Sequence, residues 1–385
     1  MKRTGLMIAA VGLFLFAQSA RAEWAPAKRL TWNSGSSEAP AVAVDSWGNI
    51  HVVWADDTPN PDEPEIYYKK SADGGTNWSA NRRLTWNSGK SVNPSIAVDP
   101  SGSLHVVWQD DTPGNGDIYY LSSPDGGTTW TTAQRISWTA AVSQAPAIAV
   151  DLWGNLHLLW YDFAPGNYEI YHKSSTNGGA DWSKNQRLTW TVGWSGHPAI
   201  VIDSALNPHA VWSDESPGNS EIYYKSSLDG GASWSFNQRL TWNSGISQAP
   251  AIAVSSSGAL HVAWWDNTPG NAEIYYKKST TGGSTWTANK RLTRSSADSQ
   301  SPAVAVDSSG DPHLVWWDSK PGNAEIYYAT GTSGGSAWSP GTRLTWSSGN
   351  SYGPAIVLDY MSNIHVVWYD NTAGNYEVYY RKYNK

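Results

Sequence analysis

The feature that most limits how this chain can fold is a segment that recurs seven times. The motif HxxW begins at His51, and its copies follow at one spacing of 54 residues and then five spacings of 52. Segments of the types PAIAVD and RLTW recur in the same register. A period this regular indicates an array of one supersecondary unit, because each unit buries its apolar face against its neighbours.

Each copy of the unit predicts four short strands. The segments PAIAVD, LHVVWxD, EIYYKKS and NQRLTW are rich in β-branched and aromatic residues, and Gly, Asn, Asp and Pro separate them. No helical pattern of useful length occurs after the first 22 residues. Four short strands in about 50 residues are typical of a propeller blade. The sequence therefore predicts an all-β fold, a seven-bladed β-propeller with four-stranded blades.

The two ends of the chain predict how the ring closes. The chain ends in EVYYRKYNK, which corresponds to a third strand, and a fourth-strand segment, EWAPAKRLTW, precedes the first complete unit. We therefore expect residues 24–32 to complete the last blade by pairing with residues 376–383. This closure ties the ends together without a disulfide, since the chain has no cysteine.

The first 22 residues have the features of a secretory signal peptide. Lys2 and Arg3 precede the apolar run MIAAVGLFLFA, and the small-residue segment ARA ends at Ala22. We expect residues 1–22 to be removed and residues 23–385 to form a single propeller domain that is secreted or periplasmic. The apolar run is too short for a comfortable membrane span, and no other run approaches one, so no membrane span is predicted.

Charge and composition narrow the class of partner. Removal of Lys2, Arg3 and Arg21 leaves 23 basic residues against 33 acidic ones, a net charge of −10. Without a basic run, nucleic acid is excluded as a partner, and without cysteine, thiol chemistry is excluded. The 25 Trp and 20 Tyr residues suit sugar platforms, interfaces and half-buried sheets alike.

A second motif, SxDGGxxW, lies between the third and fourth strands of six copies. Its carboxylate suggests a catalytic or metal-binding loop. However, Asp73 and Asp125 are replaced by Asn177, Thr281 and Ser333 in other copies. These residues still accept hydrogen bonds within a turn, but they cannot act as general acids or nucleophiles. The motif is therefore predicted to be a structural turn.

These turns resemble the Asp-box, or bacterial neuraminidase repeat, of the sialidase-like β-propeller family. The likeness rests on Ser71, Asp73, Gly75, Thr76 and Trp78 and recurs over the whole chain after residue 22. It implies that the Asp-boxes are structural and lie away from the active face. Members of the family include sialidases, xyloglucan hydrolases, sortilin-type receptors and lectins. Sialidases have six blades, and their Arg-Ile-Pro signature is absent here, so no catalytic residue carries over and none is predicted.

Two other sets of repeated residues are predicted to be structural. The HxxW histidines lie on apolar strands, where a buried, hydrogen-bonded imidazole is expected rather than a metal ligand. The arginines at Arg29 and its equivalents match two acidic series in number, one starting at Asp56 and one at Glu65, which predicts repeated ion pairs. No metal site and no cofactor are predicted.

The candidate binding residues lie in the loops of the face opposite the Asp-boxes. An aromatic plane beside polar side chains is what sugar binding requires, although packing between blades is the alternative role for each Trp. One copy has Arg294 instead of Trp. The predicted ligand-binding residues are Trp32, Trp86, Trp138, Trp190, Trp242, Trp346, Asp56, Asp110, Asp162, Asp214, Asp266, Asp318, Asp370, Asn115, Asn167, Asn219, Asn271, Asn323 and Asn375.

Three functions remain open at the level of sequence. The first is a secreted multivalent binding propeller, lectin-like, with glycans as partners. The second is a sialidase-like glycoside hydrolase with one asymmetric site, built from departures such as Trp194, Trp317 and His172, which are scattered along the chain. The third is a structural scaffold that binds a protein surface. Near-identical repeats favour the first and third, because catalysis usually needs one unique constellation. The oligomeric state is left open.

Overall fold

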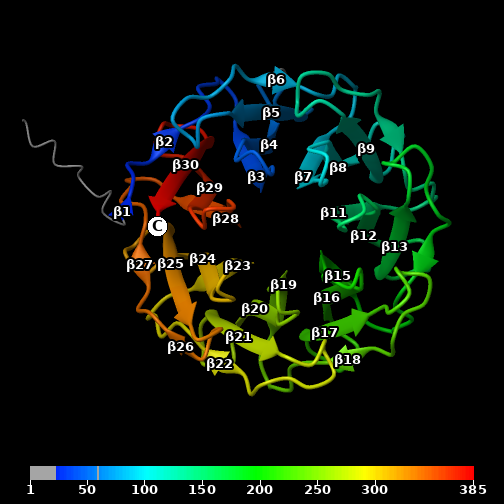
Figure 1. Ribbon diagram of the computed structural model, residues 1–385, viewed down its shortest axis with the longest axis vertical. Helices are drawn as coiled ribbons and strands as arrows, with labels where there is room; N and C mark the ends of the chain where they lie inside the picture. Colours follow the sequence, from blue (N-terminus) through cyan, green and yellow to red (C-terminus); the bar gives the residue numbers. More distant parts are fainter. Residues whose placement is uncertain (1–22, 59) are drawn as a thin grey trace, which may run out of the picture.

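The chain forms a closed ring of seven β-sheets around an open axis (Figure 1). The computed structural model describes residues 23–58 and 60–385; the predicted signal peptide, residues 1–22, lies outside them. Every regular element in these ranges is a β-strand. The described residues include no helix long and apolar enough to cross a membrane. The prediction of an all-β, seven-bladed propeller is confirmed.

The strands of blades 1 to 4 follow one another in the order of the chain. Blade 1 contains β3 (Ser37–Val44), β4 (Ile50–Asp56), β5 (Glu65–Ser71) and β6 (Arg82–Arg83). Blade 2 contains β7 (Ser91–Val98), β8 (Leu104–Asp110), β9 (Asp117–Ser123) and β10 (Gln134–Arg135). Blade 3 contains β11 (Ser143–Val150), β12 (Leu156–Asp162), β13 (Glu169–Ser175) and β14 (Gln186–Arg187). Blade 4 contains β15 (Ser195–Ile202), β16 (Pro208–Asp214), β17 (Glu221–Ser226) and β18 (Gln238–Arg239).

Blades 5 and 6 repeat this order, and blade 7 joins the two ends of the chain. Blade 5 contains β19 (Ser247–Val254), β20 (Leu260–Asp266), β21 (Glu273–Ser279) and β22 (Lys290–Arg291). Blade 6 contains β23 (Ser299–Val306), β24 (Pro312–Asp318), β25 (Glu325–Thr332), β26 (Ala337–Trp338) and β27 (Thr342–Arg343). Blade 7 contains β28 (Ser351–Leu358), β29 (Ile364–Asp370) and β30 (Glu377–Asn384), with β1 (Glu23–Trp24) and β2 (Lys28–Arg29) at its outer edge.

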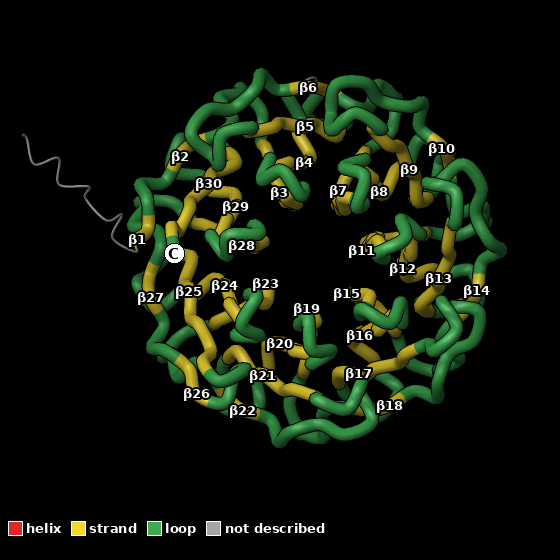
Figure 2. Tube along the Cα trace, viewed as in Figure 1, coloured by secondary structure: helices red, strands yellow, loops and turns green. Residues whose placement is uncertain are grey.

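The hydrophobic core is divided into layers between neighbouring blades. In each blade the first strand lies next to the axis and the fourth at the outer edge (Figure 2). The second strand is buried on both faces, which explains its nearly continuous apolar sequence. Between blades 2 and 3, for example, Ile118 and Tyr120 pack against Leu156, Leu158 and Trp160. Each blade is therefore stabilised by both of its neighbours.

The first and fourth strands differ in length from the segments expected from the sequence. The first strand begins three residues before the expected proline, and a β-bulge separates its two halves, as between Glu38 and Ala41. The residue before the proline is left-handed in all seven blades, with φ of 45–52° at positions such as Ala145 and His197. The fourth strand pairs with the third over only two residues, Arg82 and Arg83 in blade 1, and Leu84 adds one further backbone hydrogen bond to Ile66.

The expected closure of the ring is confirmed. Trp24 lies opposite Tyr383, and Arg29 lies opposite Tyr379, both in antiparallel register with β30. β1 and the C-terminus consequently lie side by side at the outer edge of blade 7 (Figure 1).

Trp24 also occupies the position of the seventh Asp-box tryptophan. In the other blades this Trp packs edge-on against an aromatic ring of the preceding blade; Trp78 lies 5.0 Å from Tyr380, measured between ring centroids. Trp24 makes the same contact with Tyr328, also at 5.0 Å. The N-terminal strand therefore supplies both the missing hydrogen bonds of blade 7 and the missing aromatic contact between blades 6 and 7.

Candidate functional site

The Asp-box is a self-contained turn. In blade 2, Asp125 accepts hydrogen bonds from the Thr129 backbone N–H (2.7 Å) and the Thr129 hydroxyl (2.6 Å), and these bonds lower the pKa of Asp125 to about 2. Asn177 and Thr281 accept the equivalent backbone bond at 2.9 Å in their own blades. An amide or a hydroxyl oxygen therefore serves here as well as a carboxylate does, and the turn does not require a charge at this position.

The repeated histidines are buried in a polar network within each blade. Nδ1 of His51 lies 2.8 Å from the Tyr68 hydroxyl, and Nε2 lies 3.3 Å from Asp45. Burial lowers the pKa of His51 to about 4, although Asp45 opposes the shift. The expected structural role fits this arrangement. Within residues 23–58 and 60–385, no three His, Asp or Glu side chains are grouped as a metal ion would require.

Each arginine of the repeated set pairs with the acidic residue at the start of the third strand. In blade 1, Arg83 Nη2 donates to Glu65 at 2.6 Å, and Arg83 Nε donates to the Thr85 carbonyl at 2.6 Å. The predicted ion pairs therefore join the third and fourth strands of one blade, and the Asp56 series takes no part in them.

The Asp residues predicted to bind ligand are buried. Asp110 is fully buried and accepts bonds from the Trp108 indole (3.0 Å), the Ser91 hydroxyl (2.9 Å) and the Thr112 backbone N–H (3.0 Å). These bonds occupy both carboxylate oxygens. The position is repeated in Asp56, Asp162, Asp214, Asp266, Asp318 and Asp370, each at most 5% exposed. These buried carboxylates therefore hold the loops in place from beneath.

The predicted Asn residues hold the loops of the same face in place. Asn115 Nδ2 donates to the carbonyls of Thr139 (3.3 Å) and Ala141 (2.6 Å), in the loop that leads to the next blade. Equivalent bonds are made by Asn167, Asn219, Asn271, Asn323 and Asn375. The Asn and Asp residues therefore fix the loop that follows each exposed Trp.

The six predicted Trp residues, in contrast, face solvent. Their exposed fractions are 66–72%, whereas the tryptophans on the second strands, such as Trp54 and Trp368, are at most 3% exposed. The interpretation that Trp32, Trp86, Trp138, Trp190, Trp242 and Trp346 are packed between blades does not fit this exposure. An arginine of the same strand lies beside each ring, as Arg83 does 5.8 Å from the centroid of Trp86.

Cavities between two blades open beside Trp32 and Trp346, and beside Arg294, which replaces the Trp in its repeat. The repeat places the equivalent space beside the other exposed Trp residues. We call these spaces rim grooves and number each by the blade that supplies its third strand. Groove 7 holds a cavity of about 340 Å³ lined by Trp346, Trp368, Tyr379 and Arg381. Groove 1 holds one of about 430 Å³ lined by Trp32 and Lys69 together with the Asp-box residue Trp78. Residues of a fourth strand or of the segment directly after it line both cavities, and the fourth strands lie at the outer edge of the ring (Figure 2).

A cationic side chain from the third strand reaches across five of the seven grooves. Lys69 Nζ donates to the Leu30 carbonyl of the preceding blade at 2.5 Å and lies 5.6 Å from the centroid of Trp32. Burial lowers the pKa of Lys225 and of Lys277 to about 8. The cationic positions are Lys69, Lys173, Lys225, Lys277 and Arg381, while Leu121 and Ala329 replace them in grooves 2 and 6.

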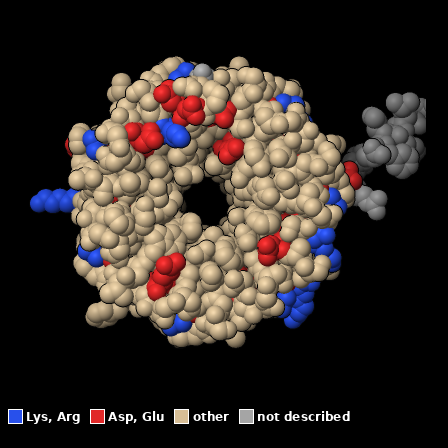
Figure 3. Space-filling model, turned by 180° about the vertical axis from the view of Figure 1, so that it is seen from behind, with Lys and Arg blue, Asp and Glu red and all other residues tan. Residues whose placement is uncertain are grey.

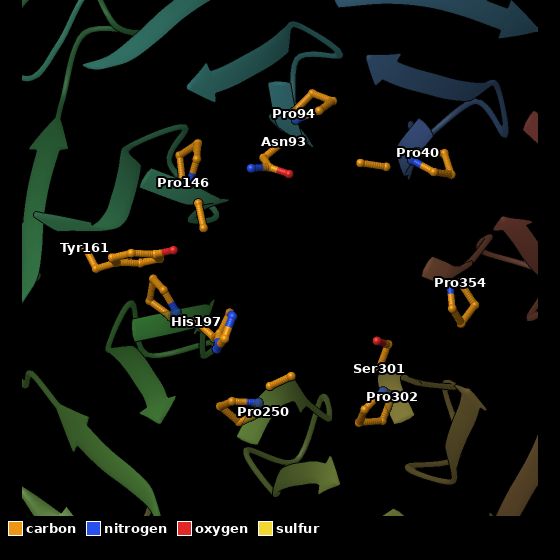
Figure 4. A pocket seen from close by; sticks show the side chains of 14 residues that line it. Pro40, Asn93, Pro94, Pro146, Tyr161, His197, Pro250, Ser301, Pro302 and Pro354 are labelled. Carbon is orange, nitrogen blue, oxygen red and sulfur yellow. The ribbon is translucent and has the colours of Figure 1, made fainter. Parts of the chain in front are cut away.

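A different cavity of about 480 Å³ lies at the mouth of the axial channel. The seven prolines of the first strands and six of the seven left-handed residues before them line it (Figure 4). Asn93, Tyr161 and His197 lie on one side of this mouth, and Ser301 lies on the opposite side (Figure 4). A left-handed non-glycine residue costs about 1–3 kcal/mol, and such strain often marks a functional position.

The sequence did not single out Asn93, Tyr161 and His197, because only the folded ring brings them together. Trp194 joins this side, with its ring centroid 5.0 Å from His197 and 5.9 Å from Tyr161. The available signal was the residue before each proline, which is polar in only three repeats, at Asn93, His197 and Ser301.

Solved structures with the same fold include enzymes that act on carbohydrates. An ulvan lyase of a polysaccharide lyase family, bound to -[GlcA(1-4)Rha3S]-, has a TM-score of 0.65 and 9% identity, and the alignment covers 92% of this chain and 95% of that one. The Hadza microbial sialidase Hz136 has a TM-score of 0.55 and 15% identity, covering 86% and 76%. The NanB sialidase of Streptococcus pneumoniae, as its K499G mutant, has a TM-score of 0.54 and 13% identity, covering 92% and 70%.

These likenesses establish a sialidase-like propeller fold. No protein-family model matches the chain, and no curated protein matches it in sequence. Membership of the Asp-box family therefore stays a prediction from the motif.

Proposed function

We propose that this protein is an exported, multivalent carbohydrate-binding propeller whose rim grooves are the binding sites. The observation that carries the proposal is the exposure of the same tryptophan in six of seven repeats. An indole ring of this size is usually buried, and a regular series of exposed ones marks a binding surface. The face of a sugar ring stacks on such a plane, and neighbouring donors and acceptors bind its hydroxyls.

The repetition of the grooves supports binding to a polymer with a repeated unit. Neighbouring grooves are related by one blade of a rigid ring, so one long chain or a dense glycan surface can engage several together. A weak site then gains effective affinity, because each further contact is intramolecular. The sialidase and polysaccharide lyase names of the fold neighbours support the class of ligand, and the predicted signal peptide supports export.

A glycan array with residues 23–385 tests this proposal. We expect binding that weakens in steps as Trp86, Trp190 and Trp242 are each replaced by alanine, with a loss of about 2 kcal/mol at each altered groove, typical of a central Trp contact. Phe236→Ala is the matched control, because Phe236 is exposed outside the grooves. Binding that is unchanged in the triple variant would refute the rim grooves as the site, and absence of any glycan binding would favour a protein-binding scaffold.

The channel mouth favours one second candidate, an enzyme with a single asymmetric site that acts on a polysaccharide. Asn93, Tyr161 and His197 supply an amide, a phenol and an imidazole on one side of a single cavity. His197 is exposed at this mouth, partial desolvation there lowers its pKa, and imidazole is a common general base. Turnover of a polysaccharide that is lost in His197→Ala and kept in Trp190→Ala would establish this function instead.

A further inference from the structure

The cationic side chains of the rim grooves have no acidic partner. Among the described residues, none of the four groove lysines forms an ion pair with a carboxylate. Lys225 and Lys277 are each 6% exposed, and each donates to one backbone carbonyl of the preceding blade, Leu188 and Leu240 respectively. An ammonium has three N–H donors. Beside that single bond, the Nζ atoms of Lys225 and Lys277 lie 5.8 and 5.7 Å from the ring centroids of Trp190 and Trp242, and no carboxylate neutralises either charge.

Burial of an ammonium without a counter-ion costs stability, the indole ring beside it offsets only part of that cost, and an anion in the groove would lower the remainder. The lowered pKa of Lys225 and Lys277 follows from the same burial. Two buried acidic residues of the same blade as Lys225 are engaged by other partners. Asp214 is held by the Ser195 hydroxyl and the Trp212 indole, and Glu221 by Arg239.

The grooves that differ from the common pattern differ in their cationic residue. Groove 6 has lost both the Trp and the third-strand Lys, yet its cavity of about 270 Å³ is lined by Arg294 and Lys320. Groove 2 keeps the exposed Trp86 but has Leu121 in place of the cation. Positive charge is therefore present in six grooves, and groove 2 shows that the fold accepts an apolar residue at this position.

The distribution of charge over the ring points in the same direction. The chain is acidic, with a net charge of −7. In the view of Figure 3, Lys and Arg nevertheless lie mostly along the outer edge, while several Asp and Glu lie nearer the central opening. On this face, positive charge therefore lies farther from the axis than these acidic side chains do.

We propose that the rim grooves select acidic carbohydrates, with a sugar ring on the exposed Trp and its carboxylate or sulfate group on the Lys or Arg of the groove. This inference rests on the proposed function of the grooves. The carboxylate of a hexuronate and the sulfate ester of a neutral sugar present the same chemistry, an anionic oxygen group that accepts charge-assisted hydrogen bonds.

The test uses three immobilised probes and residues 23–385. The probes are a hexuronate oligosaccharide, the same oligosaccharide with its carboxyl groups reduced to alcohols, and a sulfated neutral oligosaccharide. The variant is Lys69→Leu/Lys225→Leu/Lys277→Leu, which copies the composition of groove 2. The control is Lys184→Leu, a surface lysine on the Asp-box side of blade 3.

We expect the intact protein to bind at least one acidic probe at least about tenfold more tightly than the reduced one, and the triple variant to lose that preference. The melting temperature of the triple variant should stay equal or rise, because a purely structural lysine would lower it on removal. Whichever acidic probe binds identifies the anion as carboxylate or sulfate. Equal binding of all three probes would overturn the selectivity and leave the carbohydrate-binding function standing. Binding of none of the three probes by a protein that does bind in the glycan array would also overturn the selectivity for acidic carbohydrates.

Discussion

At the scale of the residue, the same repeat holds both deeply buried and fully available side chains. His51 and Asp56 are completely buried and hydrogen-bonded, whereas Trp32, from the preceding blade, is 66% exposed. The sequence separated His51, which lies on an apolar strand, from the other two residues. It could not separate Asp56 from Trp32, because repetition preserves structural contacts and binding contacts equally. Solvent exposure distinguishes structural residues from candidate binding residues, and it depends on how neighbouring blades pack.

The buried histidines predict how stability depends on pH. Burial lowers the pKa of His51 and of His261 to about 4, below the value of about 6.5 in an unfolded chain. Between these values the unfolded state binds protons at imidazoles that stay neutral in the folded state, so stability falls as pH falls from about 6.5 to 4.

Urea unfolding at pH 7.0, 5.5 and 4.5 measures this dependence. We expect the midpoint to fall steadily over the series, and to fall less steeply in His51→Gln, which removes one titrating group. A midpoint that is independent of pH over this range would contradict neutral, buried histidines.

At the scale of the element, the Asp-box turn joins two blades through a close approach. A Cβ atom added to Gly127 would lie 2.0 Å from the Tyr68 hydroxyl of the preceding blade, and Gly127 has a φ of 95°. The turn motif could be predicted from sequence because its glycines, acceptor and Trp lie within eight residues. The contact with the preceding blade could not, since Tyr68 lies 59 residues away.

The turn predicts different effects of two substitutions at Asp125. Asp125→Asn should leave the melting temperature nearly unchanged, because Asn177 fills the same position in blade 3. Asp125→Ala should lower it, because the backbone N–H and hydroxyl of Thr129 lose their acceptor. Thermal unfolding followed by circular dichroism distinguishes the two. Equal melting temperatures for the alanine and asparagine variants would show that the acceptor has no structural role.

At the scale of the whole molecule, the ring is held closed by the N-terminal strand. The blade number, strand order and closure could be predicted, because the period and the unequal ends of the chain are properties of the sequence itself. The residues grouped at the channel mouth could not be predicted, because Asn93, Tyr161 and His197 come together only when blades 2, 3 and 4 are in place. The pairing of each groove cation with an exposed Trp could not be predicted either, because the two residues come from neighbouring blades.

The closure predicts that Trp24 contributes to the stability of the entire ring. Trp24→Ala removes the contacts with Tyr328 and Tyr383, and we expect a loss of roughly 2–3 kcal/mol, somewhat less than for a fully buried Trp. Trp47→Ala is the control, because Trp47 is 66% exposed on a turn. Urea unfolding measures both. Equal stability of the two variants would contradict a closing role for Trp24.

The number of ligand molecules bound by each chain tests the central claim most directly. Isothermal titration of residues 23–385 with a short oligosaccharide that binds in the array measures it, because a short ligand fills one groove at a time. Six of the seven grooves carry the exposed Trp, so the account predicts a stoichiometry near six, falling to near three in Trp86→Ala/Trp190→Ala/Trp242→Ala. A stoichiometry of one ligand per chain, unchanged in that variant, would contradict it and place binding at the channel mouth.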